Sequence, residues 1–145
     1  MQFKPSNQAF ITEVETSFAK QALMTLIGAQ LTRVEPGLIE ISLPFRPDLT
    51  QQNDYLHAGI VTTIADSACG YAAYTLMPAG SSVLSVEFKV NLLRPAIGSG
   101  FVAVAEVLKP GRTLTVVRSD VFAIDDGGTR ELVATMLGTM MCLRR

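Results

Sequence analysis

Hydrophobic and polar residues alternate with a period of two through most of the second half of the chain. This alternation is typical of β-strands that have one buried face. Strand-like runs occupy residues 82–92, 101–109, 113–124 and 131–143, and their connections PAIGSG, KPGR and DDGG are typical of hairpin turns. The pattern predicts four consecutive antiparallel strands. The hydrophobic face of the first strand would consist of Leu84, Val86, Phe88, Val90 and Leu92.

The first half of the chain is predicted to hold two helices and a pair of short strands. Hydrophobic residues recur at near-helical spacing from residue 6 to about residue 29. Glu35-Pro36-Gly37 is a turn signal that separates two strand-like runs. After a polar loop, residues 59–77 are expected to form a second helix, about 28 Å long. Its many small residues would let a sheet approach closely.

This order of elements predicts an α+β fold in a single domain that spans residues 1–145. A long hydrophobic helix next to a curved antiparallel sheet is buried most economically when the sheet wraps around it. The edge strands of such a sheet invite pairing with a second copy across a two-fold axis. We therefore expect a homo-oligomer, either a dimer or a dimer of dimers.

Composition narrows the class of protein. Hydrophobic residues make up 48% of the chain and charged residues 17%, which excludes intrinsic disorder and suggests that a second subunit covers apolar surface. The net charge is −1 and the sequence has no basic patch, so no nucleic-acid partner is expected. The N-terminus lacks a signal-peptide pattern, and Asp66 interrupts the apolar segment 59–78. We therefore expect a cytoplasmic protein without a membrane span.

Asp66 is the only charged residue between His57 and Glu87. A carboxylate on a largely apolar helix is partly removed from water, which favours a role as a general base. The alternative is an exposed polar position without a role. Cys69 lies one turn later and could pair with His57 as a nucleophile, although a small buried hydrophobic residue is the simpler interpretation. The two cysteines and single histidine match no metal-site spacing.

Four segments together resemble the PaaI-like hotdog thioesterases. LHAGIVTTIADSACGYAA is similar to that family's HGG-x(6)-D signature, and SVEFKVNLLRPA is similar to the strand that follows it. VLKPGRTLTVVRSDVFA and ELVATMLGTMM match the family's last hairpin. The resemblance implies a hotdog fold and hydrolysis of acyl-CoA thioesters with aryl or medium-chain acyl groups. It implies no cofactor, because coenzyme A is part of the substrate.

The resemblance also implies a role for each residue of the signature. Asp66 would activate water or itself attack the thioester carbonyl. The backbone N–H of Ala58, where the family usually has glycine, would donate to the carbonyl oxygen, and Gly59 keeps the second glycine. Free N–H groups at a helix N-terminus suit such an oxyanion site. His57 would mainly shape the loop, with proton transfer as the alternative.

Three further positions follow from the same resemblance. The family's asparagine, six residues before the histidine, falls on Gln51, and the nearby Asn53 is an alternative polar helper. The family's serine on the next strand corresponds to Ser85.

A basic turn is the last candidate site. By resemblance Lys109, Gly111 and Arg112 border the coenzyme A site, where cations would meet phosphates. The alternative for each of them is a solvated β-turn. Arg94 is a weaker candidate of the same kind.

Two other functions remain open at this point. One is a hotdog hydratase or dehydratase, although the loop signatures of that class are absent. The other is a non-catalytic module that binds acyl thioesters, since Ala58 and Gln51 depart from the family's pattern.

Overall fold

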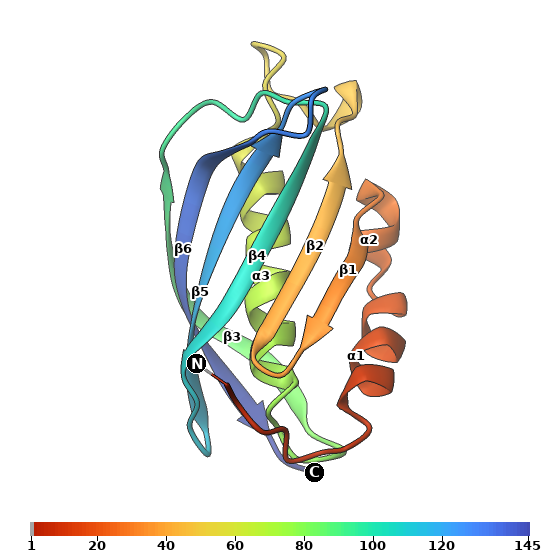
Figure 1. Cartoon of the computed structure of the whole chain (residues 1–145), viewed down its shortest axis with the longest axis vertical. Coiled ribbons are helices and arrows are strands. Elements are labelled where there is room, and N and C mark those ends of the chain that lie inside the picture. The colour runs from red at the N-terminus through yellow and green to blue at the C-terminus, as the bar shows by residue number, and fades with distance from the viewer. Residues whose placement is uncertain (1) are drawn as a thin grey trace.

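The computed structural model describes residues 2–145, and in it six antiparallel strands form one curved sheet around a long helix (Figure 1). The helices are α1 (Phe10–Ala19), α2 (Ala22–Ile27) and α3 (Ala58–Tyr74), with a short 3-10 turn at Pro47–Leu49. The strands are β1 (Gln30–Glu35), β2 (Leu38–Pro44), β3 (Ser82–Leu92), β4 (Gly100–Lys109), β5 (Leu114–Ile124) and β6 (Arg130–Leu143). The predicted α+β hotdog arrangement is confirmed.

Helix α3 fills the concave side of the sheet and contacts strands β2 to β6. Its sheet-facing side repeats at helical spacing, so one stripe of side chains is completely covered. Each of these residues is at most 2% exposed: Val61, Ile64, Ala65, Ala68, Cys69 and Ala72. Because most of them are small, the strands approach the helix closely. Residues on the opposite side of α3, which include Asp66, are only partly buried.

The strand order is β1-β2-β4-β5-β6-β3, which corrects the prediction of four consecutive neighbours. Strands β4, β5 and β6 are joined by hairpins as expected, but β3 pairs with β6 and β4 pairs with β2. The PAIGSG segment is therefore a crossover between distant strands and not a hairpin turn. Strand β3 consequently lies at an edge of the sheet.

A β-bulge at Val86 also corrects the predicted face of β3. Ser85 pairs with Met140 and Phe88 pairs with Gly138, and both partners are buried on the inner face of β6. The bulge inserts one residue, so the alternation of inward-facing and outward-facing side chains shifts by one position within β3. Leu84 and Phe88 therefore face opposite sides of the sheet. Ser85 faces inward, toward α3.

The N-terminal helix predicted for residues 6–29 is instead two helices. Gln21 has an extended backbone conformation (φ −74°, ψ 98°) that ends one helix and begins the next. Its side chain hydrogen-bonds to Tyr71 of α3, which anchors the break. Gly28 then ends α2 in the left-handed conformation, with φ 78°. Helices α1 and α2 lie beside β1 (Figure 1).

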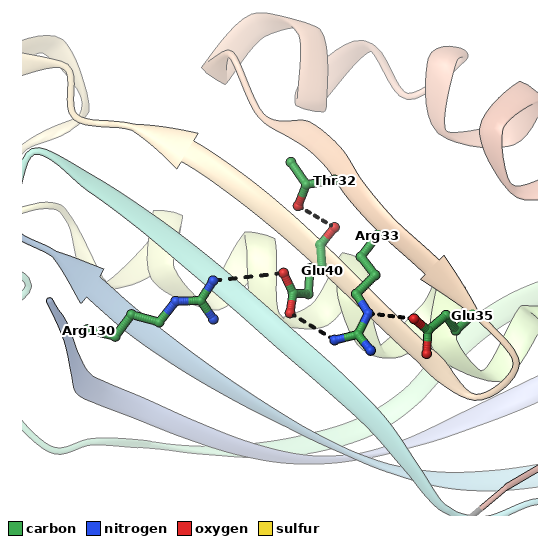
Figure 2. A network of polar contacts seen from close by, with 5 residues as sticks. All are labelled: Thr32, Arg33, Glu35, Glu40 and Arg130. Atoms are coloured by element: carbon green, nitrogen blue, oxygen red, sulfur yellow. Dashed lines mark hydrogen bonds and ion pairs between the residues drawn. The ribbon is translucent and has the colours of Figure 1, made fainter. Parts of the chain in front are cut away.

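Ion pairs cross the strands on the sheet, away from the edge formed by β3. Glu40 of β2 lies between Arg33 of β1, at 3.5 Å, and Arg130 of β6, at 4.0 Å (Figure 2). Arg33 also contacts Glu35 at 2.8 Å. Ion pairs at the surface contribute little to stability, because water and salt screen them. They give this part of the surface a polar character. No helix in residues 2–145 is long and apolar enough to cross a membrane.

Candidate active site

Asp66 lies in the middle of α3, on the side that faces β3. The Ser85 hydroxyl donates a hydrogen bond of 2.6 Å to Oδ1 of Asp66. The second carboxylate oxygen, Oδ2, has no hydrogen bond to any residue in 2–145. One oxygen is thus held in place while the other remains available to a water molecule or a substrate. Such a carboxylate can accept a proton or attack a carbonyl carbon.

A pocket of about 340 Å³ opens beside Asp66 and Ser85. Side chains from α1, from Gln21 between the helices, from α3 and from the start of β3 line it. Nine of its eleven lining residues carry a hydroxyl, an amide or a carboxylate. The carboxylate therefore faces a polar chamber and not the apolar core.

The N-terminus of α3 presents one free N–H group. His57 is the N-cap, and its Nδ1 accepts a hydrogen bond of 2.8 Å from the Gly59 N–H. The His57 carbonyl oxygen accepts from the N–H groups of Ile60 and Val61. The Ala58 N–H alone in this turn has no partner among residues 2–145. The helix dipole adds positive partial charge at this donor, which suits a developing oxyanion.

The geometry gives His57 and Gly59 roles in shaping this turn. With Nδ1 used as an acceptor, the neutral ring carries its proton on Nε2. A Cβ at position 59 would lie 3.0 Å from Nδ1 of His57, so a glycine there leaves room for the cap. This favours the loop-shaping role of His57 over proton transfer.

Gln51 lies beside Ala58 in a second pocket, of about 330 Å³ and largely apolar lining. Its Oε1 accepts from the backbone N–H groups of Asn53 and Tyr55, which fixes the tight turn at Asp54 (φ 64°). Its Nε2 has no hydrogen bond within residues 2–145 and is free to donate to a ligand. Asn53 is exposed and lies outside the lining of this pocket. The geometry therefore favours Gln51 as the polar helper.

Asp66 and Ala58 belong to different pockets. The pocket beside Asp66 does not include Ala58, and the pocket beside Ala58 does not include Asp66. Eight residues of α-helix separate them, which corresponds to about 12 Å along the axis. A single chain therefore does not bring the carboxylate and the free N–H to one carbonyl group.

The basic turn with Lys109 and Arg112 lies at the end of the molecule opposite the start of α3 (Figure 1). Both residues are exposed, and neither side chain makes an ion pair within the described part of the chain. Packing requires a glycine at position 111, since a Cβ there would clash with the Leu114 carbonyl oxygen. Arg94 is already engaged, with Glu131 at 3.2 Å and the Leu132 carbonyl oxygen at 3.0 Å.

Known proteins share this fold and these sequence features. The family model of the Thioesterase superfamily matches residues 53–129, more than half of the chain. The chain belongs to the thioesterase superfamily. A Saccharolobus solfataricus protein named "Putative esterase SSO1253" is 31% identical over 92% of this chain and 86% of its own length.

Solved structures agree with this assignment. A thioesterase family protein from Silicibacter pomeroyi is 48% identical, with a TM-score of 0.92 over 94% of this chain and 99% of that one. Escherichia coli PaaI, from the phenylacetic acid degradation operon, shares the fold with a TM-score of 0.83 at 16% identity, covering 96% of each chain. The predictions of a PaaI-like hotdog fold and of a thioester hydrolase are confirmed.

Cys69 of this thioesterase is part of the core. Its side chain is completely buried beneath the sheet. Burial, together with the nearby Asp66 carboxylate, raises the pKa of the Cys69 thiol to about 12. The thiol therefore stays protonated at neutral pH, which is unfavourable for a nucleophile.

We expect Cys69→Ala to keep kcat/KM within about threefold of wild type, because the thiol takes no part in the reaction. Some stability is lost, since the smaller side chain leaves space in a close-packed core. Thiol release and thermal unfolding are measured on the same sample. A loss of turnover at unchanged unfolding temperature would instead support a mechanism in which Cys69 is the nucleophile.

Sequence reasoning did not predict the hydrogen-bonded polar side chains that line the Asp66 pocket: Ser17, Gln21, Ser67 and Tyr71. Gln21 donates to the Tyr71 hydroxyl at 3.1 Å and accepts from the Ser67 hydroxyl at 3.3 Å. The Ser17 hydroxyl lies 3.2 Å from the Tyr71 hydroxyl. Helical spacing places Ser67 and Tyr71 on one side of α3. Their partners on the N-terminal helices are about 50 residues away in sequence, and no local pattern reveals them.

Proposed function

We propose that this chain hydrolyses acyl-CoA thioesters to a free acid and coenzyme A, at a site shared by two subunits. Asp66 of one subunit and the Ala58 N–H of the other would act on the same carbonyl group. The observation that carries this proposal is the separation of Asp66 and Ala58 into two pockets of one chain. Each chain holds two half-sites, and a second copy completes both.

The free oxygen of Asp66 supports a direct role in the chemistry. As water attacks the thioester carbon, Asp66 takes one of its protons, and the Ala58 N–H stabilises the oxyanion. The tetrahedral intermediate then collapses, the C–S bond breaks, and the proton passes from Asp66 to the coenzyme A thiolate. Alternatively, Asp66 attacks the carbonyl carbon first, the C–S bond breaks as the coenzyme A thiolate leaves, and water then hydrolyses the mixed anhydride to the free acid and restores Asp66. In either case Ser85 keeps the carboxylate oriented.

The edge strand β3 supports a homodimer. Four of its hydrophobic side chains are between 41% and 54% exposed: Leu84, Val86, Phe88 and Leu92. An apolar edge with unpaired backbone groups favours pairing with another chain. Antiparallel pairing of β3 with its copy would continue the sheet across a two-fold axis. A further association of two dimers is compatible with this arrangement.

The same two-fold pairing would set the α3 helices side by side in opposite directions. The start of one α3 then approaches the middle of the other, where Asp66 lies. The basic turn lies at the opposite end of its own chain from Ala58 (Figure 1). Across the axis, Lys109 and Arg112 of one subunit would therefore approach the Ala58 half-site of the other. Their free cations suit the phosphates of coenzyme A.

We expect the double variant Lys109→Ala/Arg112→Ala to raise KM for acyl-CoA about tenfold with little change in kcat. Two exposed charge contacts of about 1 kcal/mol or less each account for an effect of this size. The same acyl group on pantetheine lacks the nucleotide phosphates, so its KM should not change. An equal change in KM for both thioesters would show that Lys109 and Arg112 do not bind the phosphates.

The experiment that tests the proposed function is release of free thiol from a panel of acyl-CoAs. A thioesterase releases coenzyme A in the steady state, with saturation in substrate. A hydratase or dehydratase instead changes the absorbance of enoyl thioesters without thiol release. A binding module does neither, although it still binds the thioesters. Thiol release from none of the panel would refute the proposal.

A further inference from the structure

Met140 of β6 is a buried residue in direct contact with the group that orients Asp66. Its side chain is completely covered, with 0% exposure. Its sulfur atom lies 3.4 Å from the Ser85 hydroxyl oxygen, and this hydroxyl donates to Asp66 at 2.6 Å. The thioether therefore contacts the hydroxyl that holds the carboxylate, although Met140 itself does not line the Asp66 pocket.

The β-bulge at Val86 brings these two side chains together. Ser85 and Met140 are directly paired across β3 and β6, and the register shifts immediately after Ser85. If the alternation that places Phe88 on the inner face continued without the bulge, Ser85 would face the outer side of the sheet. Bulges next to active sites often re-aim a side chain in this way. The bulge thus places the Ser85 hydroxyl within reach of both Met140 and Asp66.

Gly138 provides the space in which the Met140 side chain ends. A methionine side chain is unbranched and flexible, so burial alone does not select one conformation. A Cβ at position 138 would lie 2.9 Å from the Met140 methyl group, which is too close for an ordinary contact. The next nearest atoms, in Phe88 and Glu87, would lie at the ordinary distances of 3.6 and 3.7 Å. The methyl group of Met140 therefore occupies space that any side chain at position 138 would take.

We infer that Met140 is a positioning residue for the reaction and that it acts through Ser85. The Ser85 hydroxyl has one hydrogen and, among the described residues, two acceptors within reach. While Asp66 is charged, its carboxylate is the stronger acceptor and takes this hydrogen. When Asp66 holds a proton from water, it attracts the hydroxyl hydrogen less strongly. The thioether, a weak acceptor, is then the alternative partner and keeps the hydroxyl in place.

This inference rests on the proposed thioesterase function and adds one residue to the groups that carry it out. The simpler alternative is that Met140 only fills the core, as buried methionines commonly do. The two roles differ in their dependence on Ser85. A positioning role disappears when the Ser85 hydroxyl is removed, whereas a purely structural role does not.

The test measures thiol release by Met140→Leu, alone and combined with Ser85→Ala. Leucine has nearly the volume of methionine and no sulfur, so the core stays filled. With Ser85 present, we expect kcat to fall about three- to tenfold, the effect of one weak hydrogen bond, and KM to stay within about twofold. In the Ser85→Ala background the same substitution should change kcat by less than about 1.5-fold, because the hydroxyl that Met140 positions is gone.

Met136→Leu is the matched control. Met136 lies on the same strand, is 1% exposed and does not line the Asp66 pocket. The substitution makes the same chemical change in the core, and it should leave kcat at the wild-type value. Circular dichroism and thermal unfolding establish that each variant is folded.

Gly138→Ala covers the case in which Met140→Leu does not fold. The added Cβ displaces the Met140 methyl group and with it the sulfur, while its other contacts are ordinary ones. We expect kcat to fall about threefold or more when Ser85 is present and to change little in the Ser85→Ala background.

Three results would overturn the inference and leave the thioesterase function intact. The first is wild-type kcat in folded Met140→Leu, or in Gly138→Ala where that variant replaces it. The second is an equal loss of kcat with and without the Ser85 hydroxyl, which would show that Met140 only supports the core. The third is wild-type kcat in Ser85→Ala. If wild type instead releases thiol from no acyl-CoA, the proposed function itself fails, and the positioning role fails with it.

Discussion

Asp66→Asn should lower kcat for thiol release by about 10²–10⁴-fold, the usual contribution of a positioned general base. The asparagine oxygen can still accept the hydrogen bond from Ser85, which is 2.6 Å long in the wild-type chain. The side chain keeps nearly the same size but can neither accept a proton nor attack a carbonyl. The loss should therefore appear in kcat more than in KM.

The comparison needs a matched control and a test of folding. Asp126→Asn makes the same chemical change at an exposed position in the turn between β5 and β6, and it should behave as wild type. Circular dichroism should be unchanged for both variants. Turnover of a folded Asp66→Asn variant within tenfold of wild type would refute the role of this carboxylate.

The main elements of the fold follow from local patterns in the sequence. The alternation between residues 101 and 143 predicted strands that match β4, β5 and β6 within one residue at each end. The long helix was predicted for residues 59–77 and is observed as Ala58–Tyr74. These patterns are reliable because the spacing of hydrophobic residues depends only on which face of one element is buried. The order of strands in the sheet depends on contacts between elements, which local spacing does not determine. The predicted adjacency of β3 and β4 was therefore wrong.

Other errors have the same origin in contacts between distant residues. Nothing within residues 82–92 marks Val86 as a bulge, since its pairing depends on β6. The break at Gln21 depends on Tyr71, 50 residues later. Asp66 was found because it is an isolated charge on an apolar helix, and Ala58 because the resemblance to the hotdog signature implies its role. The hydroxyl groups around Asp66 come from three parts of the chain and have no common motif.

The shared site is tested by complementation between two variants that are each inactive. Asp66→Asn removes the carboxylate, and Ala58→Pro removes the N–H donor, which should cost about 10²–10³ in rate. The chain tolerates proline at this position for three reasons. Ala58 is the first residue of α3, where proline is favourable. His57 already has the extended conformation that must precede a proline, with ψ 136°. The Ala58 N–H makes no hydrogen bond within residues 2–145 that proline would remove.

In a mixed dimer one site would collect both defects, and the other site would be intact. Random mixing gives half of the dimers as mixed, and each of these has one good site of two, so activity should return to about a quarter of wild type. The decisive measurement is thiol release after the two variants are refolded together, with mass spectrometry or tagged subunits to verify the exchange. The shared-site account predicts recovery to about a quarter of wild-type turnover from two inactive parents. Verified mixed dimers that remain as inactive as their parents would contradict it.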